Sequence, residues 1–403
     1  MKTIYVDNNA TTPVAPEVVD AMLPYLRDEF YNPSSAYERA RGTAQAVDSA
    51  RKTIAKMLGG IEPDEIWFTS CATESNNTAL RGAARANPHR RHIITSAVEH
   101  PAVLEVCKAM GREGFEVTIL PVDESGQLDV GDYVRALRPD TLIVSLMHAN
   151  NETGVIFPVS ELARIAKETD PQILFHTDAT QTVGKLPIDL KREFNHVDLF
   201  SFSGHKLHAP KGVGALFVRR GTPCTPYLLG GHQERGRRAG TENVAGIVAL
   251  GKACELAQTH VADEERVRGL RDRLEREIVA AVPYTQVNGG DALRLPNTLN
   301  VSFHFVEGES ILFQLDQAGI CASSGSACTS GSLEPSHVLR AMKVPFTAAH
   351  GSVRFSFSRY NSDADVDAIV QAFPAIIASL RKISPYWDSE QNGPRQGPEI
   401  KLG

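Results

Sequence analysis

The sequence contains the stretch Val197-Asp198-Leu199-Phe200-Ser201-Phe202-Ser203-Gly204-His205-Lys206. It begins as an apolar run typical of a buried strand and ends in small and polar residues. A second strand-like run, Val213–Val218, follows closely. We therefore predict that Lys206 lies just after the carboxyl end of a buried strand. A Schiff-base lysine, whose amine is activated by a desolvated or cationic setting, suits this place better than an ordinary surface lysine.

Similar β-rich runs recur along the chain, and helical patterns separate them. The runs are Glu65–Thr69, His92–Thr95, Glu116–Leu120, Thr141–Leu146, Ile173–His176, Val197–Phe202 and Val213–Val218. Helical spacing is found in Ser75–Ala86, Pro101–Glu113 and Val159–Thr169. Strands that are apolar throughout and alternate with helices predict an α/β fold with a mostly parallel, helix-covered sheet.

The second part of the chain has a different pattern. A long helical stretch runs from about Asn243 to Val282, with a break near residues 261–263. Strand-like runs at Thr298–Phe305 and Ser352–Ser358 and a helix near Asp363–Leu380 then predict a smaller α+β domain. We expect a large cofactor-binding domain at 14–257 and a small domain made of 1–13 and 258–403. The tail after residue 387 is expected to be disordered or to lie on the surface.

Composition excludes several classes of protein. The 403 residues are 42% hydrophobic and 22% charged, which is typical of a globular protein with a sizeable core. A formal charge of -6 argues against a dedicated nucleic-acid binder. Neither a signal peptide nor an apolar run long enough to span a bilayer is found, so we expect no membrane association and a cytoplasmic location.

The six cysteines form no C-x-x-C pair and are expected to be reduced thiols. Cys107 and Cys254 lie in apolar helical patterns and are expected to fill the core. Cys328 differs, because every other residue of Ser323–Ser332 is small. Such a run cannot anchor itself in a core. We predict a mobile, solvated loop at about 321–334 that carries one nucleophilic thiol.

Polar residues also follow other strands. Asp178 ends the run that contains His176, and a carboxylate in this position can pair with a pyridinium nitrogen and keep that ring electron-withdrawing. His176 and Asp178 share a face of the strand, so a metal pair is an alternative, although no third ligand has a convincing spacing.

Two further segments join a strand to a helix. Small and hydroxylated residues in Thr69–Asn77 predict a phosphate site at a helix N-terminus, although ordinary capping produces the same composition. His100 suits either an aromatic stacking role or a histidine satisfied within the core. Because the carboxyl ends of parallel strands meet at one edge, these segments should converge on one ligand. A lysine, an acid, a phosphate cradle and a stacking histidine predict a pyridoxal-phosphate site.

The chain resembles the cysteine desulfurases, class-V members of the aminotransferase superfamily. The resemblance rests on Asp7–Pro13, Ala72–Ser75, Glu99-His100, Asn150–Glu152, Ser203–Lys206 and the Cys328 loop. The segments Gly204–Gly212 and Gly230–Asn243 are most similar to the nitrogen-fixation (NifS) branch, and the housekeeping branch is the alternative. The resemblance implies the pyridoxal-phosphate-dependent transferase fold type I. Cys71 stands where other members often carry glycine.

The resemblance also implies a role for each matching residue. Lys206 would hold the cofactor and move protons, Asp178 would pair with the ring nitrogen, and His100 would stack on the ring and assist catalysis. Arg354 would clamp the substrate carboxylate. The remaining implied contacts are Gln181 and Asn151 to the ring's oxygen substituent, Asn151 also to the substrate, Ala72, Thr73, Ser203 and His205 to the phosphate, and Thr241 of the partner subunit of a homodimer to the same phosphate.

The implied reaction converts L-cysteine to L-alanine. The Cys328 thiolate attacks the substrate sulfur and becomes a persulfide, which an iron–sulfur scaffold protein would receive, and Cys328 would briefly ligate iron in a nascent cluster. A selenocysteine lyase is an alternative, although removal of selenium does not strictly require a protein thiol. A sulfur carrier or cluster scaffold is another, but it has no use for Lys206, Asp178 and Arg354 together.

Overall fold

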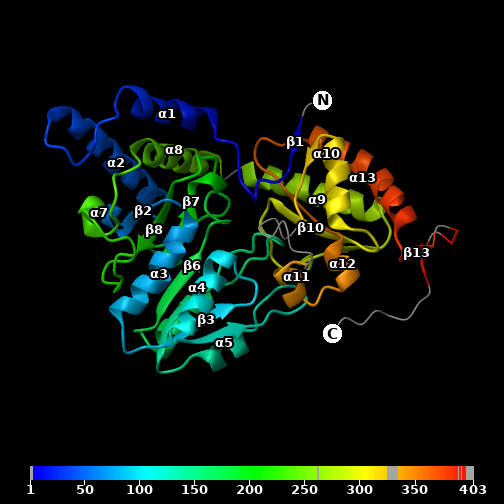
Figure 1. The fold of residues 1–403 in the computed structure, drawn as a ribbon, viewed down its shortest axis with the longest axis horizontal. Coiled ribbons are helices and arrows are strands. Elements are labelled where there is room, and N and C mark those ends of the chain that lie inside the picture. Colours follow the sequence, from blue (N-terminus) through cyan, green and yellow to red (C-terminus); the bar gives the residue numbers. More distant parts are fainter. Residues whose placement is uncertain (1–2, 261–262, 325–334, 389, 392, 396–403) are drawn as a thin grey trace.

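The structure is a computed structural model that describes residues 3–260, 263–324, 335–388, 390–391 and 393–395. Two lobes lie side by side, with the N-terminal strand joined to the second lobe (Figure 1). Cys328 and most of its predicted loop lie outside the described residues.

A seven-stranded sheet forms the centre of the first lobe, in the order β2-β8-β7-β6-β5-β3-β4. Its strands are β2 (Ile66–Thr69), β3 (His92–Ser96), β4 (Glu116–Leu120), β5 (Thr141–Ser145), β6 (Leu174–Asp178), β7 (Leu199–Ser203) and β8 (Gly214–Val218). Only β8 runs antiparallel to its two neighbours, and the other adjacent pairs are parallel. The predicted α/β class and mostly parallel sheet are confirmed.

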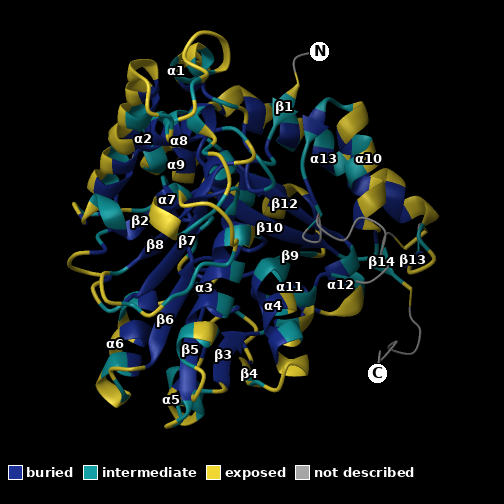
Figure 2. Cartoon of the chain, turned by 60° about the vertical axis from the view of Figure 1, so that its left-hand side comes forward, coloured by how far each residue is buried: buried dark blue, intermediate teal, exposed yellow. Residues whose placement is uncertain are grey.

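Helices cover both faces of this sheet, as the continuous apolar strands predict. Leu199 of β7 faces the core beneath α3 (Ala72–Ala86) and α4 (Pro101–Arg112). Phe200 and Phe202 face the opposite core. That core is covered by α2 (Glu38–Met57), α6 (Val159–Thr169) and α8 (Val244–His260). All strands of this sheet except the edge strand β4 are buried, whereas the outer faces of the helices are exposed (Figure 2).

The remaining helices of this lobe are α1 (Pro16–Arg27), α5 (Val130–Ala136) and α7 (Gln233–Gly236). The sequence pattern did not predict α1 or α2. The buried face of α2 consists largely of small residues such as Ala40, Thr43 and Ala50.

The second lobe is built on a three-stranded antiparallel sheet, β12-β10-β9. Its strands are β9 (Thr285–Val287), β10 (Thr298–Phe303) and β12 (Ser352–Ser356), and its helices are α9 (Asp263–Ala281), α10 (Gly308–Gln317) and α13 (Asp363–Ile383). The first strand, β1 (Ile4–Tyr5), pairs with β11 (Ile320–Cys321). Residues from both ends of the sequence therefore build this lobe.

Three hydrophobic clusters are found among the described residues, two on the faces of the seven-stranded sheet and one in the second lobe. Val6 packs with α9, α10 and α13 in one cluster. Two short helices from late in the sequence, α11 (His337–Ala341) and α12 (Phe346–His350), pack instead against the core of the first lobe. We propose the division near residue 258, with α11 and α12 crossing between the lobes. Among the described cysteines Cys107 and Cys254 are buried in the core as predicted, and none forms a disulfide.

The described part of the tail lies against the second lobe. Trp387 is buried within β13 (Trp387–Asp388), which pairs with β14 (Gly393–Pro394). No helix within the described ranges has both the length and the apolar composition needed to cross a membrane.

Candidate active site

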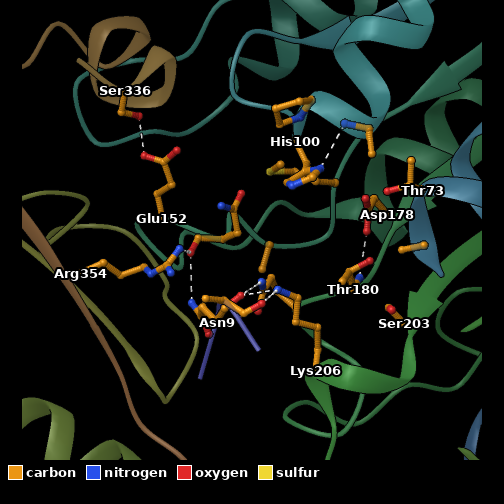
Figure 3. A pocket seen from close by; sticks show the side chains of 18 of the residues that line it. Asn9, Thr73, His100, Glu152, Asp178, Thr180, Ser203, Lys206, Ser336 and Arg354 are labelled. Carbon is orange, nitrogen blue, oxygen red and sulfur yellow. Dashed lines mark hydrogen bonds between the residues drawn. The ribbon is translucent and has the colours of Figure 1, made fainter. Parts of the chain in front are cut away.

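A cavity of about 480 Å³ lies between the lobes, at the edge where the carboxyl ends of β3, β5, β6 and β7 meet. Nearly all the residues singled out from the sequence line it. They are Ala72, Thr73, His100, Asn151, Asp178, Gln181, Ser203, His205, Lys206 and Arg354. Figure 3 shows Lys206, Asp178, His100 and Arg354 pointing into this space from different elements.

Lys206 enters the cavity from the short 3-10 helix η2 (Gly204–Lys206), which directly follows β7. Its Nζ donates hydrogen bonds to the backbone carbonyls of Asn9 and Ala10, the second at 2.7 Å. Both carbonyls belong to the segment after β1. The N-terminal segment thus holds the amine of a lysine that lies almost two hundred residues later in the chain.

Asp178 ends β6 and is buried. Its Oδ2 accepts a hydrogen bond from Nδ2 of Asn76 on α3 at 2.7 Å, and its Oδ1 accepts one from the backbone N–H of Thr180 at 2.9 Å. The alternative metal pair with His176 is unsupported. Both ring nitrogens of His176 are bonded to hydroxyls, Nδ1 to Ser145 at 2.8 Å and Nε2 to Ser201 at 2.9 Å.

The N-terminus of α3 opens onto the cavity near Asp178 and Ser203 (Figure 3). Cys71 is the N-cap residue, and its side chain does not cap the helix, so the N–H groups at Ala72 and Thr73 face the cavity without a side-chain cap. Gly214 permits this placement. A Cβ on Gly214 would lie 2.8 Å from the carbonyl oxygen of Phe202 and 3.0 Å from Cα of Cys71.

Two buried hydroxyls, those of Ser203 and Thr180, also line this end of the cavity and have no hydrogen-bond partner among the described residues. Nδ1 of His205 lies 3.1 Å from Oγ1 of Thr11. Burial and the charge of Lys206 lower the pKa of His205 to about 4, so its ring is neutral at neutral pH. An uncapped helix end beside two unpartnered hydroxyls fits the phosphate of pyridoxal phosphate, and Asp178 fits its ring nitrogen.

His100 is the N-cap residue of α4, and its Nδ1 accepts a hydrogen bond from the backbone N–H of Ala102 at 3.1 Å. Burial lowers the pKa of His100, against the attraction of Asp178 and together with the charge of Lys206. The ring is therefore neutral near pH 7. A neutral imidazole at the cavity wall suits stacking on an aromatic ring and accepting a proton.

Gln181 and Asn151, the two residues predicted to contact the ring's oxygen substituent, are hydrogen-bonded to neighbouring groups. Gln181 donates from Nε2 to the carbonyl of Asn9 at 3.1 Å, and its Oε1 accepts from Nζ of Lys185 at 3.2 Å. The carbonyl of Asn151 accepts from both Asn9 and Arg354 at 3.1 Å.

Arg354 lies on β12 in the second lobe and is 2% exposed, so it is not a surface arginine. Its Nη2 donates to Oδ1 of Asp7 at 2.7 Å, and its Nη1 donates to the carbonyl of Asn151. The Nε atom is buried and has no partner among the residues that the structure describes. A fixed guanidinium with an unused donor is suited to a carboxylate ligand.

Several residues around the cavity were not predicted. Asn9 and Glu152 lie in motifs that the sequence analysis quoted without giving these two residues a role, and Asn76 lies one turn of helix after Thr73. Glu152 is buried, and it accepts a hydrogen bond from Oγ of Ser336 at the start of α11. Burial raises the pKa of Glu152 to about 7, although the hydroxyl of Ser336 and the charge of Arg354 oppose this.

Glu99, which precedes His100, is expected to make the free energy of unfolding depend on pH. It is fully buried, and its Oε1 accepts hydrogen bonds from Oγ of Ser96 and the N–H of Met147, both at 2.8 Å. Burial raises the pKa of Glu99 to about 8 from the usual 4.5, so the folded protein holds a proton that the unfolded chain releases above pH 4.5. The free energy of unfolding should therefore fall between about pH 4.5 and 8, relative to Glu99→Gln, by on the order of a few kcal/mol.

Urea unfolding of both proteins at several pH values measures this difference. Parallel pH profiles for wild type and Glu99→Gln would show that Glu99 is not protonated in the folded protein.

Two predicted residues are not placed at the cavity. Thr241 is exposed and does not line it, so its implied phosphate contact would have to come from a second copy of the chain. Cys328, with its predicted roles as nucleophile and transient cluster ligand, lies outside the described residues.

Comparisons with known proteins show the family of the chain. The family model described as aminotransferase class-V matches residues 4–369. The chain is 54% identical to "Cysteine desulfurase 2" of Trichormus variabilis over 402 residues, covering 100% of both chains. It is 53% identical to "Cysteine desulfurase NifS" of Azotobacter vinelandii over 399 residues, covering 99% of this chain and 98% of the relative.

A solved structure described as a NifS-like protein superposes with a TM-score of 0.88 at 38% identity, covering 94% of this chain and 100% of the other. This superposition confirms the fold predicted from the resemblance. Together with the family match and the two relatives, it shows that the chain belongs to the aminotransferase class-V family.

Proposed function

We propose that this protein is a pyridoxal-phosphate-dependent cysteine desulfurase, which converts L-cysteine to L-alanine and leaves the sulfur as a persulfide on Cys328. One observation carries the proposal. A single cavity has the amine of Lys206 and the carboxylate of Asp178 in one part of its wall and the buried guanidinium of Arg354 in another. Relatives named as cysteine desulfurases match the chain over its full length.

Different residues of the chain would bind the cofactor and move protons. The helix end at Ala72 and Thr73, with the hydroxyl of Ser203, would hold the phosphate, and Asp178 would hold the ring nitrogen. When bound, pyridoxal phosphate supplies an electron-withdrawing ring that stabilises loss of the Cα proton of an amino acid. Lys206 would carry protons at the substrate, because its Nζ is already held beside the cavity by two carbonyls.

Arg354 would bind the substrate carboxylate and so orient the amino acid between itself and Lys206. The Cys328 thiolate would attack the substrate sulfur. A sulfur–sulfur bond forms as the carbon–sulfur bond breaks, and the carbon takes up a proton to become the methyl group of alanine. One L-cysteine and one thiol thus give one L-alanine and one persulfide, with no external oxidant.

A homodimer would complete the site. Thr241 is exposed, and Leu229 in the same irregular region is 79% exposed, which is unusual for a large apolar side chain unless a partner covers it. We propose that Thr241 reaches the phosphate of the partner subunit.

The persulfide would pass to an iron–sulfur scaffold protein, with Cys328 as a brief ligand of nascent iron clusters. The similarity to a relative named NifS supports a role in supplying sulfur for nitrogenase. Genes for nitrogenase beside the gene for this protein would favour the nitrogen-fixation branch over the housekeeping branch. A cytoplasmic location suits this role, because reducing compartments keep thiols free.

The test uses the purified holoenzyme. It should be yellow, bleach on treatment with borohydride, and form equal amounts of L-alanine and sulfide from L-cysteine and an added thiol. Retained colour without alanine formation would reject cysteine as the substrate, and absence of bound cofactor would reject this class of enzyme.

A further inference from the structure

Asn9 lies in the segment Asp7–Pro13, for which neither the sequence nor the proposed chemistry supplies a role. It is buried and lines the cavity between Lys206 and Arg354, as Figure 3 shows. Its polar groups contact the surroundings of both residues.

The backbone of Asn9 belongs to the Lys206 end of the site. Its carbonyl oxygen accepts hydrogen bonds from Nζ of Lys206 and from Nε2 of Gln181. Its N–H donates to Oγ of Ser356 on β12 at 2.9 Å. The residue is thereby fixed between the two lobes.

The side chain of Asn9 belongs to the Arg354 end. Its Nδ2 donates to the carbonyl of Asn151 at 3.1 Å and to Oγ1 of Thr298 at 2.8 Å, while its Oδ1 accepts from Nδ2 of Asn297 at 3.0 Å. The carbonyl of Asn151 is the same atom that accepts from Nη1 of Arg354. One carbonyl therefore receives both the amide of Asn9 and the guanidinium.

The orientation of Arg354 depends on two acceptors, the carboxylate of Asp7 and the carbonyl of Asn151. A guanidinium has five N–H donors, so these two bonds leave others, including the unpartnered Nε, for a carboxylate ligand. A shift of the Asn151 carbonyl would release Nη1 and leave the guanidinium of Arg354 oriented by Asp7 alone.

We propose that the side-chain amide of Asn9 is a positioning group that holds the Asn151 carbonyl in place for Arg354. Asn9 thereby links the position of this arginine to that of Lys206, whose amine is bonded to the Asn9 carbonyl. It thereby sets the affinity of the site for the carboxylate of an amino acid. This inference rests on the proposed function, because it assumes that Arg354 receives that carboxylate.

The experiment compares variants of the holoenzyme. L-alanine, which carries the carboxylate but no sulfur, is titrated while the absorbance of the bound cofactor is followed. Asn9→Ala should weaken L-alanine binding about tenfold, the value of roughly one buried hydrogen bond. The KM for L-cysteine should rise by a similar factor, while kcat changes less than about threefold. Asn9→Ser, which keeps a short donor, should fall between wild type and Asn9→Ala.

Asn8→Ala is the matched control. Asn8 is the neighbouring residue, is equally buried and donates from Nδ2 to the carbonyl of Ser356 at 2.9 Å, but it does not line the cavity. Removal of the Asn8 side-chain amide should lower the free energy of unfolding and leave L-alanine binding unchanged. Equal weakening by Asn8→Ala and Asn9→Ala would overturn the proposal, because a general loosening of the fold would then explain both.

A double-mutant cycle tests the coupling itself. In an Arg354→Lys background, Asn9→Ala should weaken L-alanine binding by less than about twofold, since the group that it positions is already lost. The same tenfold effect in both backgrounds would overturn the proposal. A wild-type enzyme that bound L-alanine but did not desulfurate L-cysteine would reject the proposed function, and the comparison of Asn9 with Asn8 would still be informative.

Discussion

Lys206→Ala is expected to reduce formation of L-alanine from L-cysteine by at least about a thousandfold. The substitution removes both the amine that would attach the cofactor and the group that would move protons at the substrate. In the folded protein this amine is held beside the cavity by the carbonyls of Asn9 and Ala10. No other lysine lines the described cavity wall, so none is placed to replace it.

Two measurements check this expectation. One is the rate of L-alanine formation, and the other is the mass of the protein after reduction with borohydride, which should increase in wild type and not in the variant. Lys211→Ala is the control, because Lys211 is exposed and follows on the same connection to β8. A Lys206→Ala enzyme with more than about a tenth of wild-type activity would show that another amine carries the cofactor.

Cys328→Ala is expected to abolish persulfide formation and to lower alanine formation from L-cysteine by a factor on the order of a thousand. Alanine has no thiolate to attack the substrate sulfur. Incubating wild type with L-cysteine without added thiol should place one extra sulfur on the peptide that contains Cys328, as mass spectrometry would show. Full alanine production by Cys328→Ala would refute the persulfide mechanism.

Cys224→Ala is the control for this experiment. Cys224 is a described cysteine whose pKa burial raises to about 12, so its thiol is unreactive near neutral pH, and it does not line the cavity. The same pair of enzymes separates a desulfurase from a selenocysteine lyase. Selenocysteine turnover that far exceeds cysteine turnover in wild type and persists in Cys328→Ala would favour the lyase.

The sequence was sufficient to predict the seven strands of the central sheet to within about two residues, because most of them are apolar runs bounded by polar residues. It also predicted that Lys206, Asp178 and His100 share one site, since each follows a strand and the carboxyl ends of parallel strands meet at one edge. The structure places these residues around one cavity. The helices α1 and α2 were missed. Val18 is the one fully buried residue of α1, and the buried face of α2 consists largely of small residues.

The partners that hold the site residues could not be predicted from the sequence. Asp7 binds Arg354, Asn76 binds Asp178, and Ser336 binds Glu152, yet each pair is separated by more than a hundred positions. A hydrogen bond depends on distance and direction in space, whereas the periodicity of a sequence reports only which face of its own element a side chain occupies. The strands and the chemical groups at their ends can therefore be read from the sequence. The packing of the two lobes establishes which of those groups are fixed by partners and which remain available to a ligand.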